Sequence, residues 1–383
     1  MVWIFLYFAL FLVVHLVAKQ FKRPGAARLF QLIACFVLLF GFFGFRDLTV
    51  LNDTSHYYGF YYEKAHIHSY IIEPITTFHL TDKFEYGFQI LIHILIQQVS
   101  KHPYTIVILS SLIITIAELW VIDKYAKDIA KVCFYMLIAS LLFTHYCIIR
   151  QAFALIFFYI AFGYLEQEKI RKYLLLVLLA SLFHYSALFL FALPLIAHIK
   201  PSKRNAVIAV GTALFTAVFL FEILSLLGLR DHPYYQNAVQ KGTLSLIGIV
   251  DLIFICIILS ICFIAHKWNR HSTISPLYFW ICITALCISM VAPVIYPISR
   301  INEFFWPFII FQLLRCMNPS AMRLPDAEKK GKNSSLLCIM VVSLFAIKLI
   351  AINTIRPEWL HINNYQFYDF SKMHHDYNLY PQE

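Results

Sequence analysis

The sequence has few charged residues. Asp, Glu, Lys and Arg make up 14% of its 383 residues, whereas hydrophobic residues make up 61%. Soluble domains usually carry about 25% charged residues. A soluble globule of this length has too little interior to bury so much apolar surface. The composition therefore excludes a disordered chain and a soluble enzyme, and it indicates an integral membrane protein.

Several catalytic signatures are also missing. The sequence contains no Walker A, GxGxxG, GxSxG or HExxH motif, so nothing supports nucleotide-driven transport or nucleotide chemistry. Its nine cysteines lie in or beside apolar runs and form no CxxC pair. They are expected to pack as small apolar residues rather than as a disulfide framework or a metal knuckle. We expect a metal-independent protein without a cofactor.

Long apolar runs dominate the chain. A helix needs about 20 apolar residues to cross a bilayer. The runs are continuous rather than alternating, which predicts an all-α, polytopic transmembrane helix bundle and not a barrel. One membrane domain would cover 1–383, with an extracytoplasmic loop at 46–84 and an extracytoplasmic tail at 353–383. About 12 hydrophobic segments are expected, at 2–18, 28–45, 85–100, 103–122, 132–149, 150–165, 172–199, 205–228, 246–265, 276–292, 300–316 and 335–352.

The distribution of Lys and Arg predicts the topology. Placing 123–131 and 166–172 in the cytoplasm gives the clearest excess of basic residues inside. Segment 85–100 must then be re-entrant or interfacial, and 172–199 must be a re-entrant hairpin of two short helices with His184 near its outer tip. Broken helices at membrane depth are tolerated only where they are buried in protein or line a cavity. The net charge of +10 reflects this bias, and no nucleic-acid partner is expected.

The loop that begins at residue 46 combines aromatic, acidic and basic side chains. Tyr57, Tyr58 and Asp47 suit contact with sugar rings and hydroxyls, although an aromatic belt at the membrane interface explains the tyrosines equally well. Arg46 beside Asp47 is either an interfacial salt bridge or a phosphate clamp. The residues of this loop leave both alternatives open.

Four sequence blocks carry a resemblance to a known family. They are Arg46 with Val50-Leu51-Asn52-Asp53-Thr54 and Tyr57; Glu85-Tyr86-Gly87-Phe88; Ile149-Arg150-Gln151-Ala152-Phe153-Ala154; and Ala180-Ser181-Leu182-Phe183-His184-Tyr185-Ser186-Ala187. In order and spacing they resemble the EpsG family of exopolysaccharide and O-antigen polymerases, the Wzy-like proteins. The chain departs from the family pattern at Leu51, where glycine is usual, and at Asn52, where threonine is usual. These departures predict a different local turn before Asp53.

The resemblance implies a glycosyltransferase of the bacterial cytoplasmic (inner) membrane with its active site facing the periplasm or exterior. Donor and acceptor would both be polyprenyl-diphosphate-linked glycans of O-antigen, capsule or exopolysaccharide synthesis. The bilayer is a partner by composition, and a chain-length regulator is a candidate partner. Two other classes stay open: a lipid-linked oligosaccharide flippase or transporter, and a membrane acyltransferase that modifies glycans.

Such a reaction needs a base at the acceptor hydroxyl and cations at the departing diphosphate. The candidate catalytic residues are His184, Asp53 and Glu85. The candidate diphosphate-binding residues are Arg46, Arg150, Gln151 and Arg300, and the candidate sugar-binding residues are Tyr57, Tyr58 and Asp47. More ordinary explanations exist, because Arg150 also suits a span boundary and a lone histidine such as His184 is often a satisfied core residue.

Two further polar residues lie in or near apolar segments. Glu118 lies within about one turn of a span end, so we expect its carboxylate to snorkel to the interface. His145 lies shortly before Arg150, and we expect it to share the same cavity. Neither residue is included in the candidate site.

Overall fold

Every regular element of the described chain is a helix. The structure is a computed structural model that describes residues 2–67, 84–226, 228, 236, 244–268, 275–323 and 334–371. Among these residues an isolated antiparallel bridge joins Arg46 to Phe367. The all-α prediction is confirmed. The chain forms two compact units, the first from residues 1–163, 171–185 and 342–383, and the second from 164–170 and 186–341.

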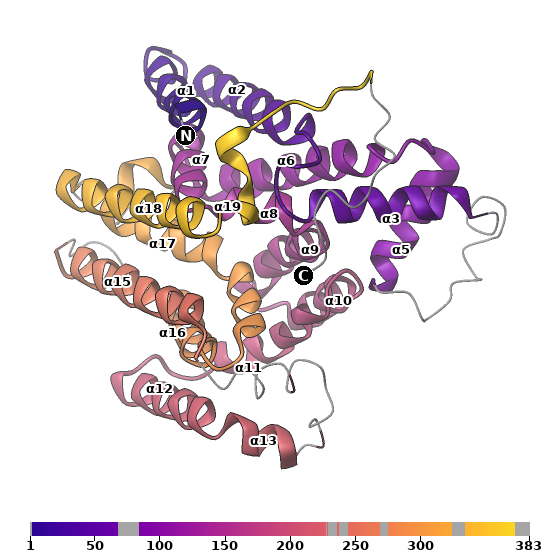
Figure 1. Ribbon diagram of the computed structural model, residues 1–383. Coiled ribbons are helices and arrows are strands. Elements are labelled where there is room, and N and C mark those ends of the chain that lie inside the picture. The colour runs from indigo at the N-terminus through magenta and orange to yellow at the C-terminus, as the bar shows by residue number, and fades with distance from the viewer. Residues whose placement is uncertain are drawn as a thin grey trace. The chain divides into compact units, whose positions relative to one another are not determined.

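The first unit holds the N-terminal helices and the end of the chain. Helix α1 packs against α2 and α7, α2 packs against α6, and α3 packs against both α5 and α6 (Figure 1). The elements are α1 (Val2–Ala18), α2 (Pro24–Gly44), α3 (Thr54–His66), α5 (Tyr86–Gln98), α6 (Thr105–Tyr125), α7 (Ile129–Ile138), α8 (Leu141–Cys147), α9 (Ile149–Glu166), α10 (Ile170–Ser181), α18 (Ser335–Ile355), α19 (Pro357–Leu360) and the 3₁₀-helix η6 (Ile362–Asn364). The last residues of α9 and the first residues of α10 and α18 belong to the second unit.

The second unit is organised around α16 (Pro276–Val291). The Ser275 hydroxyl caps this helix by accepting from the Tyr278 amide (3.3 Å), and Pro276 occupies its first position, as is usual at helix starts. Helix α16 packs against α11, α12, α15, α17 and η3. The other elements are η2 (Tyr185–Ala192), α11 (Leu193–Ala197), α12 (Lys203–Val218), α13 (Leu220–Leu226), α15 (Leu246–Trp268), η3 (Tyr296–Phe304), α17 (Trp306–Met317) and η4 (Pro319–Ala321).

Fewer helices than predicted are long enough to cross a membrane. In the described residues five qualify by length and composition, namely α2, α6, α9, α15 and α18, and up to seven qualify if each of two bent pairs is one span. The expected number of about 12 spans is therefore not confirmed. Helices α5, α10 and α17 have 12 or 13 residues and reach only about 20 Å, against a hydrocarbon core of about 30 Å.

Two predicted spans are bent helix pairs. Helices α7 and α8 meet at 74°, and α12 and α13 meet at 75°. At the first bend Ser140 adopts a left-handed conformation with φ 65°, which ends α7 and redirects the chain. The predicted break in 172–199 is also present, because α10 ends at Ser181 and His184 lies in the connection to η2. The arrangement of the two arms of that hairpin stays a prediction.

Helices α2 and α6 define two opposite ends of the first unit. Near the start of α2, Arg28 forms an ion pair with Asp123, near the end of α6. Just after α2, the main-chain carbonyl of Arg46 accepts a hydrogen bond from the hydroxyl of Tyr104, just before α6 (2.6 Å). The two helices therefore run antiparallel, and we call these the Asp123 end and the Arg46 end.

The end of α9 lies at the Asp123 end. A Cβ atom placed on Gly163 would be 2.7 Å from the Lys124 ammonium group, so the C-terminal parts of α6 and α9 are neighbours. The basic stretches that follow these two helices were both predicted to face the cytoplasm. The start of α9, with Arg150, is consequently directed toward the Arg46 end.

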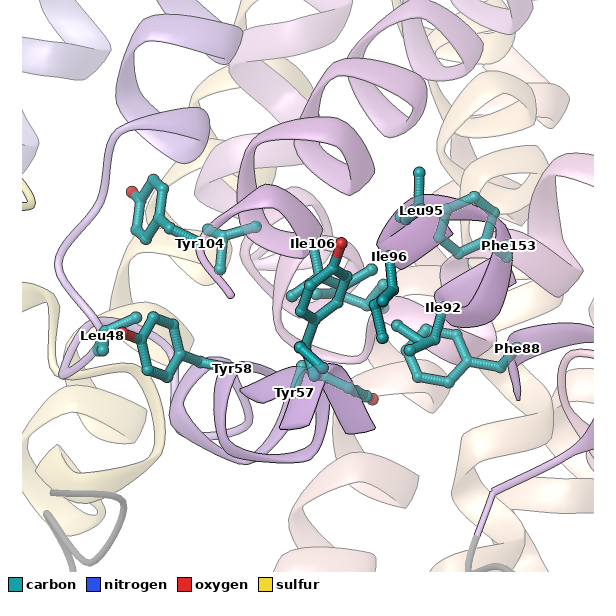
Figure 2. Packing of buried hydrophobic residues seen from close by; sticks show 14 of the residues in the cluster. Leu48, Tyr57, Tyr58, Phe88, Ile92, Leu95, Ile96, Tyr104, Ile106 and Phe153 are labelled. Atoms are coloured by element: carbon teal, nitrogen blue, oxygen red, sulfur yellow. The ribbon is translucent and has the colours of Figure 1, made fainter. Parts of the chain in front are cut away.

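An apolar cluster holds the Arg46 end together. Figure 2 shows side chains of α3, α5, α6 and α9 that converge there, including Tyr57, Phe88, Ile92, Ile106 and Phe153. Each of these five side chains is buried. Burying an aromatic or a branched aliphatic side chain contributes about 1.5–3 kcal/mol. The short helices α3 and α5 are thus fixed against the long helices α6 and α9.

Candidate functional site

Residues of three separate helical segments meet at the Arg46 end. A guanidinium nitrogen of Arg150, the second residue of α9, donates to one carboxylate oxygen of Glu85, just before α5. The Nδ1 atom of His184, just after α10, lies 3.7 Å from the other carboxylate oxygen. The Glu85 side chain is 5% exposed, whereas those of Arg150 and His184 are 21% and 15% exposed. The carboxylate is therefore buried behind two basic groups that reach the surface.

A close approach of two backbones brings Glu85 next to His184. The Gly87 amide donates to the Leu182 carbonyl (2.7 Å), and a Cβ atom on Gly87 would lie 2.9 Å from that carbonyl oxygen. Only glycine allows this approach without a shift of the backbone. The ring of Phe183 also stacks on that of Phe153 at 5.5 Å. This close approach explains in physical terms why glycine occupies position 87, two residues after Glu85.

Two aromatic residues hold the Arg150 side chain. Its guanidinium group lies over the ring of Phe84, 4.5 Å from the centroid, in the geometry of a cation–π contact. It also interacts with the hydroxyl of Tyr57, which is buried. Burial and the nearby Asp53 carboxylate raise the pKa of Tyr57 above its ordinary value, and Arg150 opposes this rise. The hydroxyl therefore stays protonated at neutral pH, and Asp53 lies close to the same group.

Arg46 is completely buried and is bound by neutral oxygens. Its side chain is 0% exposed, and burial lowers its pKa. The guanidinium group donates to Thr54 Oγ1 (3.0 Å), Ser111 Oγ (2.9 Å), the Tyr146 carbonyl (3.1 Å) and the Phe43 carbonyl. These acceptors lie in or beside α3, α6, α8 and α2. Arg46 thus joins four segments and presents four of its five donors to protein groups.

The turn before Asp53 is held by the end of the chain. The amides of Leu51 and Asn52 donate to the carbonyls of Leu360 and Trp359, both at 3.0 Å. Leu51 is buried and has φ 64°, so it keeps the left-handed conformation that glycine adopts most easily. A different turn was predicted from the presence of leucine here. The main chain instead has a glycine-like conformation, supported by residues 357–371, which we call the C-terminal strap.

The other predicted site residues have different surroundings. The rings of Tyr57 and Tyr58 belong to the apolar cluster and are 4% and 3% exposed, so protein atoms cover their faces. Asp47 Oδ1 accepts from the amide and the hydroxyl of Thr49 (3.0 and 2.7 Å). Gln151 is buried beside Arg150. Arg300 is exposed on η3 of the second unit.

A second polar group lies deeper in the first unit. Glu118 on α6 accepts from the hydroxyl of Tyr159 on α9 (2.9 Å) and pairs with His145 Nδ1 on α8 (2.7 Å). The Glu118 and His145 side chains are 3% and 1% exposed. The expected snorkelling of Glu118 is therefore wrong, because a buried partner on a neighbouring helix makes burial tolerable. The predicted contact of His145 with the Arg150 site is replaced by this pair.

The sequence motifs do not reveal that Tyr57 and Phe84 hold Arg150, nor that the C-terminal strap holds the turn before Asp53. The four-residue spacing from Asp53 to Tyr57 predicts that both residues lie on one face of a helix. This spacing is the sequence signal that Tyr57 belongs beside Asp53. The C-terminal strap has no such sequence signal, because pairing between residues about 300 positions apart leaves no local pattern.

Among the described residues, no group of three or more His, Cys, Asp or Glu side chains is close enough to hold a metal ion.

The fold and site define a helical membrane protein with a buried arginine–carboxylate–histidine cluster at one end of one unit. The model of the EpsG family matches residues 29–367, which is most of the chain and includes all four blocks. The protein belongs to the EpsG family, and this membership indicates a membrane protein of exopolysaccharide biosynthesis. Neither the characterised proteins nor the solved structures that were compared give a match.

Proposed function

We propose that the protein is a polysaccharide polymerase that joins polyprenyl-diphosphate-linked repeat units at the outer face of the cytoplasmic membrane. A hydroxyl oxygen of the acceptor sugar bonds to the anomeric carbon at the reducing end of the donor glycan. The bond from that carbon to the lipid diphosphate breaks, and its electron pair leaves with the diphosphate. The hydroxyl proton passes to a base of the protein. The Glu85–Arg150–His184 cluster is the observation that carries this proposal.

Arg150 is the cation that best suits the departing diphosphate. Its guanidinium group reaches the surface, and the Phe84 ring and Tyr57 hydroxyl fix its direction. A fixed cation in a site of low dielectric stabilises developing negative charge more strongly than a mobile one. Gln151 is the next residue and is buried, and its predicted contact with the diphosphate stays a proposal. Arg300 lies on η3 of the second unit, and its predicted binding of the diphosphate stays a proposal.

His184 is the proposed general base, and Glu85 is its positioning residue. The imidazole is more exposed than the carboxylate, and Glu85 already accepts from Arg150. A carboxylate bound in this way stabilises the imidazolium that forms when His184 takes the proton. Asp53 is half-buried near Tyr57 and is the alternative base. Asp47 and Tyr58 are proposed to shape the edge of the sugar site rather than to stack on sugar.

Purified protein in lipid vesicles, supplied with lipid-diphosphate repeat units, EDTA and no nucleotide, tests this function. Longer lipid-linked chains are the expected product. Arg150→Ala and His184→Ala should each lower the rate by a factor of about 10² to 10⁴, the range for lost charge stabilisation or general base catalysis. Arg171→Ala and His66→Ala are matched controls, because both residues are exposed and lie outside the cluster.

Each result has a defined consequence. Full-length polymer from both cluster variants, at normal protein levels, would disprove the site. Repeat units that cross the bilayer without elongation would show a flippase instead, and transfer of an acyl group to the glycan would show an acyltransferase. The Arg46 end is proposed to face outward, and this orientation follows from the basic residues near the Asp123 end.

A further inference from the structure

Gln89 is a buried polar residue of the Arg46 end that the four sequence blocks do not include. It lies on α5, four residues after Glu85, and therefore on the same face one turn further along. Its side chain is 2% exposed. Its amide nitrogen donates to the main-chain carbonyl of Phe84, and this contact fixes the direction of the amide group.

The oxygen of this amide has no hydrogen-bond partner in the described part of the chain. Gln89 Oε1 is buried, and within the described residues no donor lies within hydrogen-bonding distance of it. The Nε atom of Arg150 is likewise buried and has no hydrogen-bond partner among the described residues. A buried polar group without a partner costs about 1–3 kcal/mol. Such groups are rare in folded proteins and usually need an explanation by a ligand or a bound molecule.

The side chains of Gln89 and Arg150 both contact Phe84. The Phe84 carbonyl binds the Gln89 amide, and the Phe84 ring carries the Arg150 guanidinium group at 4.5 Å. Glu85, the next residue, pairs with Arg150 and lies 3.7 Å from His184. Gln89 and Arg150 are therefore both linked through Phe84 to the Glu85–Arg150–His184 cluster.

The chemistry of the two atoms selects the ligand. The Nε–H group of Arg150 is a donor, and Oε1 of Gln89 is an acceptor. A diphosphate presents acceptor oxygens, so it satisfies the arginine and leaves the glutamine unpartnered. A hydroxyl group accepts one hydrogen bond and donates another, and thus satisfies both atoms. We propose that Gln89 and Arg150 together bind a hydroxyl group of the acceptor sugar beside Glu85 and His184.

This inference rests on the proposed function, and it makes Gln89 a specificity-determining residue for the acceptor. Gln89→Met keeps the length of the side chain and removes the acceptor oxygen. One neutral hydrogen bond is equivalent to about a tenfold change in affinity. We therefore expect the KM for the acceptor unit to rise about tenfold in Q89M, with kcat within about twofold of the wild type. Gln98→Met on the same helix is the control, because Gln98 is exposed.

The test uses the full-length protein in lipid vesicles and repeat units isolated from cells that lack this chain. Inorganic pyrophosphate serves as a competitor that offers mainly acceptor oxygens, and its inhibition constant should be unchanged in Q89M. If the inhibition constant rises together with the KM, Gln89 only supports the packing of Arg150 and the proposal is wrong. An unchanged KM also overturns it. Gln89→Leu repeats the comparison with a different side-chain shape if Q89M does not fold.

A binding measurement separates this inference from the proposed reaction. The thermal unfolding midpoint of the wild type should rise with the intact repeat unit and also with pyrophosphate. In Q89M only the response to the repeat unit should fall. If the wild type makes no polymer but shows this pattern, the polymerase proposal fails and the hydroxyl site stands. If Q89M responds to the repeat unit like the wild type, the hydroxyl site fails.

Discussion

Substitution of Arg46 should damage the architecture of the site before it affects binding of the diphosphate. In Arg46→Met the carbonyls of Phe43 and Tyr146 lose a charged donor, at about 1–3 kcal/mol each. The hydroxyls of Thr54 and Ser111 already donate to the carbonyls of Val50 and Phe43 (2.9 and 3.2 Å), so they contribute less. We expect a loss of about 3–6 kcal/mol, a large part of the usual stability of about 5–15 kcal/mol.

Arg46→Lys provides the sharper comparison. A lysine keeps the charge but presents three donors from one point, so it reaches only part of the four acceptors around Arg46. We expect Arg46→Lys to lose about half as much stability as Arg46→Met. The measurement is the fall of the thermal unfolding midpoint in detergent. Polymer should decrease in parallel with folded protein and should return when cells grow at a lower temperature. Arg28→Lys, exposed at the Asp123 end, is the matched control.

One result would refute this reasoning. If Arg46→Lys has the unfolding midpoint and cellular level of the wild type but makes no polymer at any temperature, Arg46 contacts the substrate. Its guanidinium group would then have to leave the buried position between α2, α3, α6 and α8. A loss of polymer that follows the loss of folded protein instead supports a positioning role.

Three further experiments test other parts of the structure. Glu85→Gln should lower the elongation rate about tenfold, because a glutamine still accepts from Arg150; a loss of 10² or more would identify Glu85 itself as the base. Leu51→Gly should unfold at a higher temperature than Leu51→Ala, since alanine retains about 1–2 kcal/mol of left-handed strain at φ 64°, and the reverse order would show that this position is unstrained. A cysteine at Lys127 should react with an impermeant maleimide only from the cytoplasm and one at Lys101 only from outside, and the opposite pattern would invert the proposed orientation.

The membrane class and the local helices of this protein follow from its sequence alone. Continuous apolar runs predicted an all-α protein, and a helix forms in each of the predicted segments. Such runs contain all the information that a hydrophobic helix needs, because its hydrogen bonds are local. The same runs overestimated the number of spans, since apolar composition does not tell a 13-residue buried helix such as α5 from part of a longer span. A comparison of helix length with the thickness of the bilayer distinguishes a short buried helix from part of a span.

The candidate site was likewise predicted only in part from the sequence. Sequence motifs singled out Glu85, Arg150 and His184 as separate residues, and their types suggested their chemistry. Their contact depends on the fold, because the Gly87–Leu182 hydrogen bond joins α5 to the end of α10. It also decided that Arg46 is buried among neutral oxygens while Arg150 reaches the surface. Two arginines with equal charge receive different roles because burial and partners are set by residues that lie far away in the chain.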